Sequence, residues 1–323
     1  MIFLTFLRSA IRFSAVFIFG SVGETVTEKS GNLNLGIPGI MCMGAAGGIL
    51  GEAAYASSLS SVEQMTAWGA VLSAMLMAML MAGVGGLIYC VLTTSLRCNQ
   101  NVTGLALTTF GVGVLSFVGQ SNSNMAAAFG KASSYFTQSF PIGAEPNWFE
   151  TLFLSYGALV YIAVILAIIS AVVLKKTRVG LNLRAVGENP ATADAAGVSV
   201  TKYKYAATLI GSVIAGLGGL FYIMDMSGGN VEYDVDSFGW LAVALVIFTV
   251  WRPNWAILGS IVFSMLYILP SYTQNSSNSA VSEAIALIPY IMTMVVLVIT
   301  SIISRRESQP PASLGLTYFR EER

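Results

Sequence analysis

The chain has 323 residues, of which 55% are hydrophobic and only 10% are charged, and its mean hydropathy is +0.73. Soluble domains carry about a quarter charged residues, so this composition predicts an all-α polytopic integral membrane protein. The 16 acidic and 16 basic side chains balance, which gives no indication of nucleic-acid binding, and the absence of histidine excludes Ser-His-Asp and Cys-His catalysis and His-ligated metal sites.

The first 48 residues contain an apolar segment and a polar turn. The segment MIFLTFLRSAIRF has no basic region before its apolar part and no small-residue cleavage site after it, so a cleaved signal peptide is not expected. The stretch GETVTEKSGNLNLGIPGIMCMGAAGG, residues 23–48, joins charges to an Asn- and Gly-rich turn. We expect Glu28 and Lys29 at the cytoplasmic face and residues 31–38 as an irregular segment that enters the bilayer.

Apolar runs of about 20 residues predict membrane-spanning helices, because this length crosses the hydrocarbon core. Such runs occupy residues 64–96, 102–119, 151–174, 205–224 and 284–304. Residues 239–251 are too short to cross alone, and WRPN separates them from the run 255–270, so a pair of helices with Pro253 as the breaker is expected. The count is about eight transmembrane helices, some short or broken, packed through Gly- and Ala-rich faces.

Basic residues favour the cytoplasmic side of a membrane. They place the loop 175–204, Arg97 and the C-terminal end inside. The basic residues concerned are Lys175, Lys176, Arg178, Arg184, Lys202, Lys204, Arg305, Arg306, Arg320 and Arg323. The loops that fall outside are 120–150, 225–236 and 271–282. This topology leaves the N-terminus outside although Arg8 and Arg12 favour the inside, and an interfacial or re-entrant first segment is the alternative.

The inside loop KKTRVGLNLRAVGENPATADAAGVSVTKYKY, residues 175–205, has an ordered pattern. Its GLNLRAVGENP part predicts a turn-rich entry. Asn189 is expected to cap a helix whose first residue is Pro190, where a missing N–H costs nothing. The following ATADAA predicts a short helix that ends at Gly197. Such a helix is suited to docking into another protein, and an ordinary solvated connecting loop is the alternative.

The pattern T-R-x-G-L-N-L-R-A-V-G-E-N-P-x-x-A-D-x-A-G in this loop resembles the coupling loop of ABC importer permeases. The resemblance is strongest to the superfamily that handles branched-chain amino acids, ribose and nucleosides. In that family a short cytoplasmic coupling helix fits a cleft in the ATPase subunit and passes the closure of the ATPase dimer to the membrane helices. The resemblance implies that the coupling residues are Gly187, Glu188, Asn189, Pro190, Ala195, Ala196 and Gly197.

Three other segments agree with this resemblance. Residues 23–39 are similar to the family pattern G-E-x-x-x-E-[RK]-S-G-x-x-N-L-G-I-x-G, and SFGWLAVALV (237–246) resembles a late helix of the family. PASLGLTYFREER (311–323) resembles the tail of the nucleoside or simple-sugar subgroup. Pro38 departs from the subgroup, which usually has Glu in G-I-E-G, and it removes a charge and an N–H donor.

The resemblance implies a permease subunit of an ATP-driven importer, with a transmembrane domain at 1–304 and a cytoplasmic tail at 305–323. The chain has no G-x-x-x-x-G-K-[ST] motif, so it is expected to be non-catalytic and to hold no cofactor or metal, while a separate ATPase subunit uses ATP and Mg²⁺. The other expected partners are a second permease subunit, with a homologous heterodimer favoured over a homodimer, and an extracytoplasmic solute-binding lipoprotein. The expected location is the bacterial inner membrane.

The expected solutes are nucleosides, followed by simple sugars. A permease of the same superfamily for branched-chain amino acids or sugars is the first alternative. A secondary transporter or channel, and an intramembrane enzyme, are the others. No intramembrane carboxylate is expected, which argues against proton-coupled transport.

Polar residues at helix breaks are candidates for the solute pathway, because a broken helix in lipid must line a cavity or be buried in protein. These candidates are Asn32, Asn34, Thr103, Thr108 and Thr109. Capping of helix ends and back-bonding to the preceding turn are the alternatives for these side chains. The outer acidic residues are Asp225, Glu232, Asp234 and Asp236, which form either a solvated loop or, by the resemblance, part of the docking face for the solute-binding protein. Three cysteines are expected to be packing residues: Cys42, Cys90 and Cys98.

Overall fold

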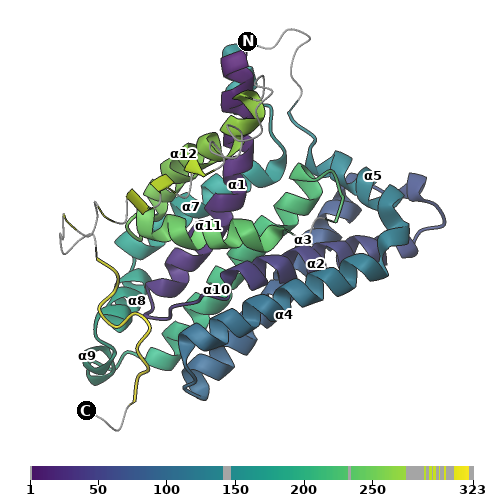
Figure 1. Ribbon diagram of the computed structural model, residues 1–323. Coiled ribbons are helices and arrows are strands. Elements are labelled where there is room, and N and C mark those ends of the chain that lie inside the picture. Colours follow the sequence, from purple (N-terminus) through teal and green to yellow (C-terminus); the bar gives the residue numbers. More distant parts are fainter. Residues whose placement is uncertain are drawn as a thin grey trace.

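The structure is a computed structural model that describes residues 2–140, 147–231, 234–273 and 309–319, together with positions 287–288, 291–292, 294–295, 298 and 302 (Figure 1). Twelve α-helices are defined within these residues. They are α1 (Ile2–Glu28), α2 (Ile37–Ser57), α3 (Ala67–Cys90), α4 (Gln100–Ser121), α5 (Ala126–Phe136), α6 (Trp148–Phe153), α7 (Ala158–Lys176), α8 (Arg178–Glu188), α9 (Pro190–Ala195), α10 (Val200–Phe221), α11 (Val235–Phe248) and α12 (Pro253–Thr273). Short π-helical turns, η2 (Val91–Ser95) and η4 (Tyr222–Met226), extend α3 and α10.

Seven helices in the described part of the chain are long and apolar enough to cross a membrane: α1, α2, α3, α4, α7, α10 and α12. The predicted spans 64–96, 102–119 and 205–224 are therefore confirmed. The predicted span 284–304 lies largely outside the described residues. The first segment is a continuous helix of 27 residues, so the re-entrant alternative for it is not supported.

Helix α11 is short and is followed by a tight turn, as the sequence predicts. Its 14 residues rise about 21 Å, less than the hydrocarbon thickness of about 30 Å. Val250 and Trp251 adopt left-handed backbone conformations, with φ of 55° and 53°, and Pro253 then opens α12. The predicted pair of helices with Pro253 at the break is confirmed.

Two local predictions are wrong. The predicted span at 151–174 is present as α7, which is long and apolar enough to cross a membrane. Its predicted start is wrong, because α6 ends at Phe153 and α7 begins after Gly157. A Cβ on Gly157 would lie 2.0 Å from the Phe136 carbonyl oxygen, so the end of α5 packs into this break. The GLNLRAVGENP segment is not turn-rich, since it belongs to helix α8, which is capped by the Thr177 side chain and buries Leu183 and Val186 on one face.

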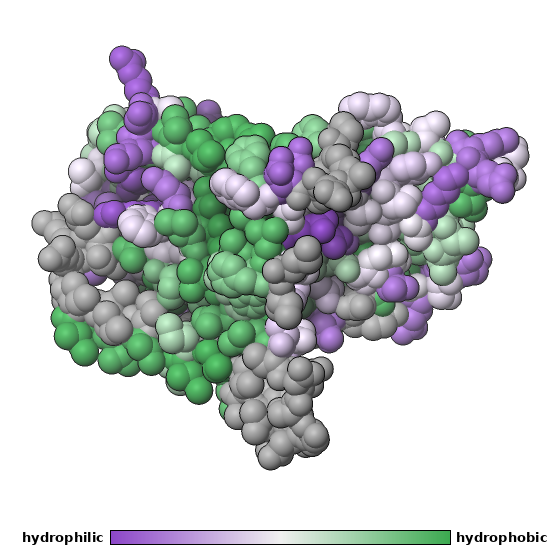
Figure 2. Space-filling view, turned by 90° about the horizontal axis from the view of Figure 1, so that it is seen from above, coloured by the Kyte–Doolittle hydropathy of each residue, from purple (hydrophilic) through white to green (hydrophobic). Residues whose placement is uncertain are grey.

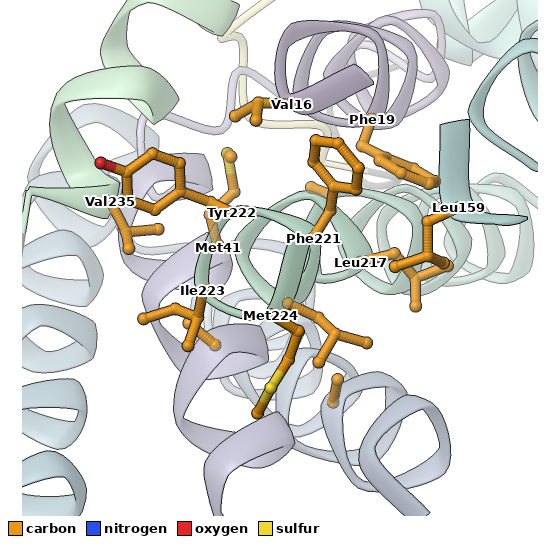
Figure 3. Packing of buried hydrophobic residues seen from close by; sticks show 14 of the residues in the cluster. Val16, Phe19, Met41, Leu159, Leu217, Phe221, Tyr222, Ile223, Met224 and Val235 are labelled. Carbon is orange, nitrogen blue, oxygen red and sulfur yellow. The ribbon is translucent and has the colours of Figure 1, made fainter. Parts of the chain in front are cut away.

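The core lies where α1, α2 and α10 meet, and α2 is the most enclosed span, with 89% of its apolar window buried. Figure 3 shows Phe19, Met41, Leu217 and Phe221 from these three helices in one packed cluster. The backbones approach closely at Gly44, where a Cβ would lie 2.2 Å from the Gly216 carbonyl oxygen. The predicted packing through small residues is confirmed at this crossing.

The outer helices present apolar side chains to the surroundings. Only 33% of the apolar window is buried in α3 and α7, and 28% in α12. Figure 2 shows hydrophobic residues over the middle and the lower left of the view from above and hydrophilic residues at its upper left and toward its right end. This apolar lateral surface is what lipid tails would cover.

The start of α1 and the tail residues 309–319 lie at opposite ends of the bundle (Figure 1). The two arginines that favoured an inside N-terminus are bound within the protein. Arg12 forms an ion pair with Asp225, and Arg8 donates to the Ser155 carbonyl oxygen at 3.3 Å. Because both partners belong to the end remote from α8 and α9, the arginines are compatible with the topology that places the N-terminus outside.

Candidate coupling and translocation sites

The short helix α9 is held at both ends by its own sequence. The Asn189 side chain accepts a hydrogen bond at 3.0 Å from the backbone amide three residues on, and Pro190 is the first helical residue. At the other end Gly197 has a φ of +83°, and the Val198 amide donates to the Ala193 carbonyl oxygen at 3.0 Å. The predicted cap and stop are confirmed, so α9 has a defined direction despite its length.

The expected coupling residues divide into an exposed and a buried group. Glu188, Asn189, Ala195, Ala196 and Gly197 are exposed, Pro190 is half-buried and Gly187 is buried. A Cβ on Gly197 would meet no atom within 4 Å. The C-terminal end of α9 is therefore a small, smooth and open surface. The opposite face of α9 is anchored, since Ala193 packs in a cluster with Val186 and Val200.

The tail segment, residues 309–319, connects helices α8 and α9 to the membrane domain. The Ser313 amide donates to the Gly187 carbonyl oxygen at 3.0 Å. Further along, the Tyr318 hydroxyl donates to Asp194 Oδ2 at 2.9 Å. The tail segment thus holds both the end of α8 and the body of α9.

The same tail segment also contacts the turn between α1 and α2, residues 29–36, which we call the signature turn. The Gly315 amide donates to the Gly31 carbonyl oxygen at 3.1 Å. The guanidinium of Arg97 stacks over the Phe319 ring at 4.8 Å from its centroid. The coupling loop, the signature turn and the α3–α4 connection therefore meet at one end of the protein, as their common inside assignment predicts.

Side chains of α3 and α4 satisfy the irregular backbone of the signature turn. The Leu33 amide donates to Gln100 Oε1 at 2.7 Å, and its carbonyl oxygen accepts from the Tyr89 hydroxyl at 2.6 Å. The Thr108 hydroxyl donates to the Leu35 carbonyl oxygen at 2.9 Å. Non-helical backbone within a membrane protein needs such partners. The signature turn, which connects α1 to α2, is therefore also hydrogen-bonded to α3 and α4.

The expected pathway residues are brought together only in part. Asn32 donates to the Thr208 hydroxyl at 3.1 Å, and Asn34 Oδ1 accepts from the Gly36 amide at 3.0 Å. Asn32 and Asn34 lie in the signature turn, and Thr108 of α4 donates to it, so these three side chains make hydrogen bonds within and beside the turn. On α4, Thr103 is buried, whereas Thr109 is exposed and donates to the carbonyl oxygen of the preceding turn.

The expectation that no carboxylate lies within the spans is wrong. Glu24, Glu28 and Glu52 belong to α1 and α2 and are buried. Glu24 Oε1 accepts from the Asn34 amide at 3.1 Å, and Glu28 accepts from the Trp251 indole N–H. Glu24 and Glu28 are four residues apart and share one helix face; Glu24 satisfies a donor of the signature turn, and Glu28 satisfies the indole of Trp251 in the turn before α12.

The outer acidic residues do not form one surface. Asp225 is only 1% exposed and accepts from Arg12 Nε at 2.7 Å, so its assignment to an exposed turn is corrected. The reason is that α10 continues through η4 and carries Asp225 into the bundle. Asp234 is exposed and Asp236 is half-buried in the first turn of α11, and Glu232 lies outside the described residues.

Three contributors to the end of the bundle that holds α8 and α9 were not predicted: Gln100, Trp251 and the tail segment. The tail motif was visible in the sequence, but likeness to a family tail does not indicate what it contacts. Trp251 belongs to WRPN, which indicated only a helix break. Cys42 and Cys90 are buried and Cys98 is exposed, and all three are free thiols. The packing role is thus confirmed for the first two.

A multi-pass helical bundle with an exposed, doubly capped helix beside a bonded signature turn defines a transporter permease. The chain belongs to the family described as the branched-chain amino acid transport system permease component, whose family model matches residues 6–300. It is therefore the transmembrane permease subunit of an ABC importer and a multi-pass protein of the bacterial inner membrane. Members of this family work with an ATPase and a solute-binding protein.

Several curated relatives cover nearly the whole chain. The nucleoside ABC transporter permease protein NupC of Lactococcus lactis subsp. cremoris is 30% identical over 292 residues, 88% of each chain. The putative glucose ABC transporter permease protein TsgC13 of Haloferax volcanii is 31% identical over 84% of this chain and 78% of its own. The guanosine ABC transporter permease protein NupQ of Bacillus subtilis is 27% identical over 96% of this chain and 95% of its own.

Proposed function

We propose that this permease imports nucleosides. Support comes from the two relatives named for nucleosides and guanosine, which align with 88% and 96% of the chain. The tail segment, whose motif resembles that of the nucleoside or simple-sugar subgroup, adds to this support. Simple sugars are the second candidate, favoured by the 31% identical relative named as a putative glucose permease.

The exposed end of α9 is the observation that carries the proposed coupling to a separate ATPase. Ala195, Ala196 and Gly197 form an open surface without bulky side chains, and the inner face of α9 is anchored by Ala193. A force on this end would reach the backbone of Lys29 through Gly187, since a Cβ on Gly187 would lie 2.4 Å from the Lys29 carbonyl oxygen. ATP and Mg²⁺ would be used by that ATPase and not by this chain.

The proposed assembly contains a second, related permease chain. Two relatives in the same Lactococcus organism, NupC and NupB, both carry the description of nucleoside permease proteins, which supports a heterodimer. At the outer end, exposed Asp234 and half-buried Asp236 are the acidic residues proposed to contact the solute-binding protein.

A secondary transporter is the competing function that the buried carboxylates raise. Glu24 and Glu28 are bound to the signature turn and to Trp251, which gives them a structural explanation. Uptake into proteoliposomes that contain all subunits separates the two functions. We expect nucleoside uptake that requires internal ATP, and uptake driven by an ion gradient without ATP would contradict the proposal.

The coupling role is tested by Ala196→Glu, which places a charge on the open end of α9. Because Ala196 is exposed, the bundle is expected to fold normally. Solute-stimulated ATPase activity is expected to fall at least tenfold, which corresponds to about 1.4 kcal/mol of lost coupling. Ala185→Glu is the matched control, since Ala185 is exposed on the neighbouring helix α8. Equal activity of the two variants would contradict docking at α9.

A further inference from the structure

A cavity of about 670 Å³ lies at the cytoplasmic end, between the end of α7, helix α8 and the turn before α12. We call it the basic cavity. Its charged lining residues are Lys29, Lys175, Arg184 and Arg252, and its aromatic lining residues are Trp251 and Trp255. Among the described residues that line it, none is acidic. The volume falls in the range of sites for small ligands, about 300 to 1,000 Å³.

The charges around the basic cavity do not balance. The carboxylates that act on Lys29 are those of Glu28 and Glu188. Glu28 already accepts from Trp251, and Glu188 accepts from the Ala312 amide at 3.4 Å. Lys175 and Arg184 form no ion pair with any described residue. Counting both carboxylates as ionised and leaving Arg252 out of the count, the three cations Lys29, Lys175 and Arg184 exceed them by one positive charge.

Lys29 is the most enclosed of these cations. It is only partly exposed, whereas Lys175, Arg184 and Arg252 are exposed. Burial lowers the pKa of Lys29, and the positive charges of Arg184 and Arg252 lower it further, while Glu188 and Glu28 act in the opposite direction. An anion held in the cavity would stabilise the charged form of Lys29. It would also reduce the repulsion of Lys29 by Arg184 and Arg252.

The basic cavity adjoins the apolar lateral surface of the bundle. Above it on α7, Ile169 and Val172 are exposed, and on α12 Leu258 is exposed. Trp255, at the rim, is 56% exposed, which is the position of the aromatic residues that sit at lipid headgroup level. A ligand with an anionic head and apolar tails would satisfy both the cations and these side chains.

We propose that the basic cavity binds the phosphate-bearing headgroup of an anionic membrane lipid, with the acyl chains along α7 and α12. Basic pockets between helices on the cytoplasmic side are where such headgroups bind. A free phosphate ion shares the headgroup chemistry but would leave the exposed apolar side chains uncovered. Because Lys29 begins the signature turn, the lipid would brace the joint that connects the coupling loop to the membrane domain.

The test is native mass spectrometry of the purified permease with phosphatidylglycerol, and with phosphatidylcholine as the lipid of zero net charge. We expect retained phosphatidylglycerol adducts and a fivefold or greater preference over phosphatidylcholine. Lys175→Gln and Arg184→Gln remove exposed cations of the cavity. Each is expected to weaken phosphatidylglycerol binding about fivefold, and the double variant about 25-fold, because each cation near an anionic membrane surface contributes about 1 kcal/mol.

The controls are Lys176→Gln and Arg178→Gln, since both residues are exposed and neither lines the cavity. Unchanged binding in the controls and monodisperse elution of every variant would complete the support. Equal losses in both pairs, or no preference for phosphatidylglycerol, would overturn the proposal. Displacement of the lipid by millimolar inorganic phosphate would contradict the proposal that the ligand is a lipid, because free phosphate would then occupy the cavity equally well. Loss of a co-purifying ATPase subunit from the double variant, with lipid binding unchanged, would make the cavity a protein contact instead.

Discussion

The pair of Arg12 and Asp225 allows a sharp test of how the outer half of the bundle is held together. Asp225 is 1% exposed and accepts from Arg12 Nε at 2.7 Å. Arg12 also donates to the Asp225 carbonyl oxygen. Arg12→Met keeps most of the side-chain volume and removes the charge. It leaves a buried carboxylate whose Oδ2 has no hydrogen-bond partner among the described residues.

The expected cost of Arg12→Met is about 3 kcal/mol of unfolding free energy. Removing one partner of a buried ion pair costs about 3 to 5 kcal/mol, and the lower end applies because the Arg12 side chain is 36% exposed. The double variant Arg12→Met with Asp225→Leu removes both charges. It is expected to be at least 2 kcal/mol more stable than the sum of the single effects implies, since no unpaired charge remains.

Unfolding of the purified protein by SDS titration in mixed micelles measures these differences. Arg8→Met is the matched control, because Arg8 makes one longer bond, at 3.3 Å, to the Ser155 carbonyl oxygen. It is expected to cost about 1 kcal/mol or less. A loss below about 1 kcal/mol for Arg12→Met, or strictly additive effects in the double variant, would refute the reasoning.

Three further substitutions test the cytoplasmic end and the core. Asn189→Ala removes the cap of α9 and is expected to cost about 1 kcal/mol in that helix; solute-stimulated ATPase activity should fall, and Asn189→Asp, which keeps a capping acceptor, should retain it. Trp251→Phe leaves the buried Glu28 carboxylate without its indole donor and is expected to cost about 1 to 3 kcal/mol in SDS titration; an unchanged titration midpoint would contradict this bond. Gly44→Ala places a methyl group 2.2 Å from a carbonyl oxygen of α10, and the resulting overpacking is expected to cost about 1 to 3 kcal/mol, measured against Gly113→Ala, where a Cβ would meet nothing within 4 Å.

The sequence by itself determined the class of protein and the caps of helix α9. Low charge and long apolar runs can be accommodated only by a membrane bundle, because each span satisfies its own backbone. Asn189, Pro190 and Gly197 act within one short segment, so the ends of α9 could be read locally. For the same reason WRPN correctly predicted the break before α12.

Only the tertiary structure decided which polar residues are partners. The sequence predicted that Asp225 lies in an exposed loop. In the structure it is paired with Arg12, which is 213 positions away along the chain. Asn32 and Glu28 likewise bind Thr208 and Trp251, which lie 176 and 223 positions away along the chain. A one-dimensional pattern reports the period of a helix face but not which helix lies opposite, and in this bundle the opposite helix determines whether a charge is solvated, paired or structural.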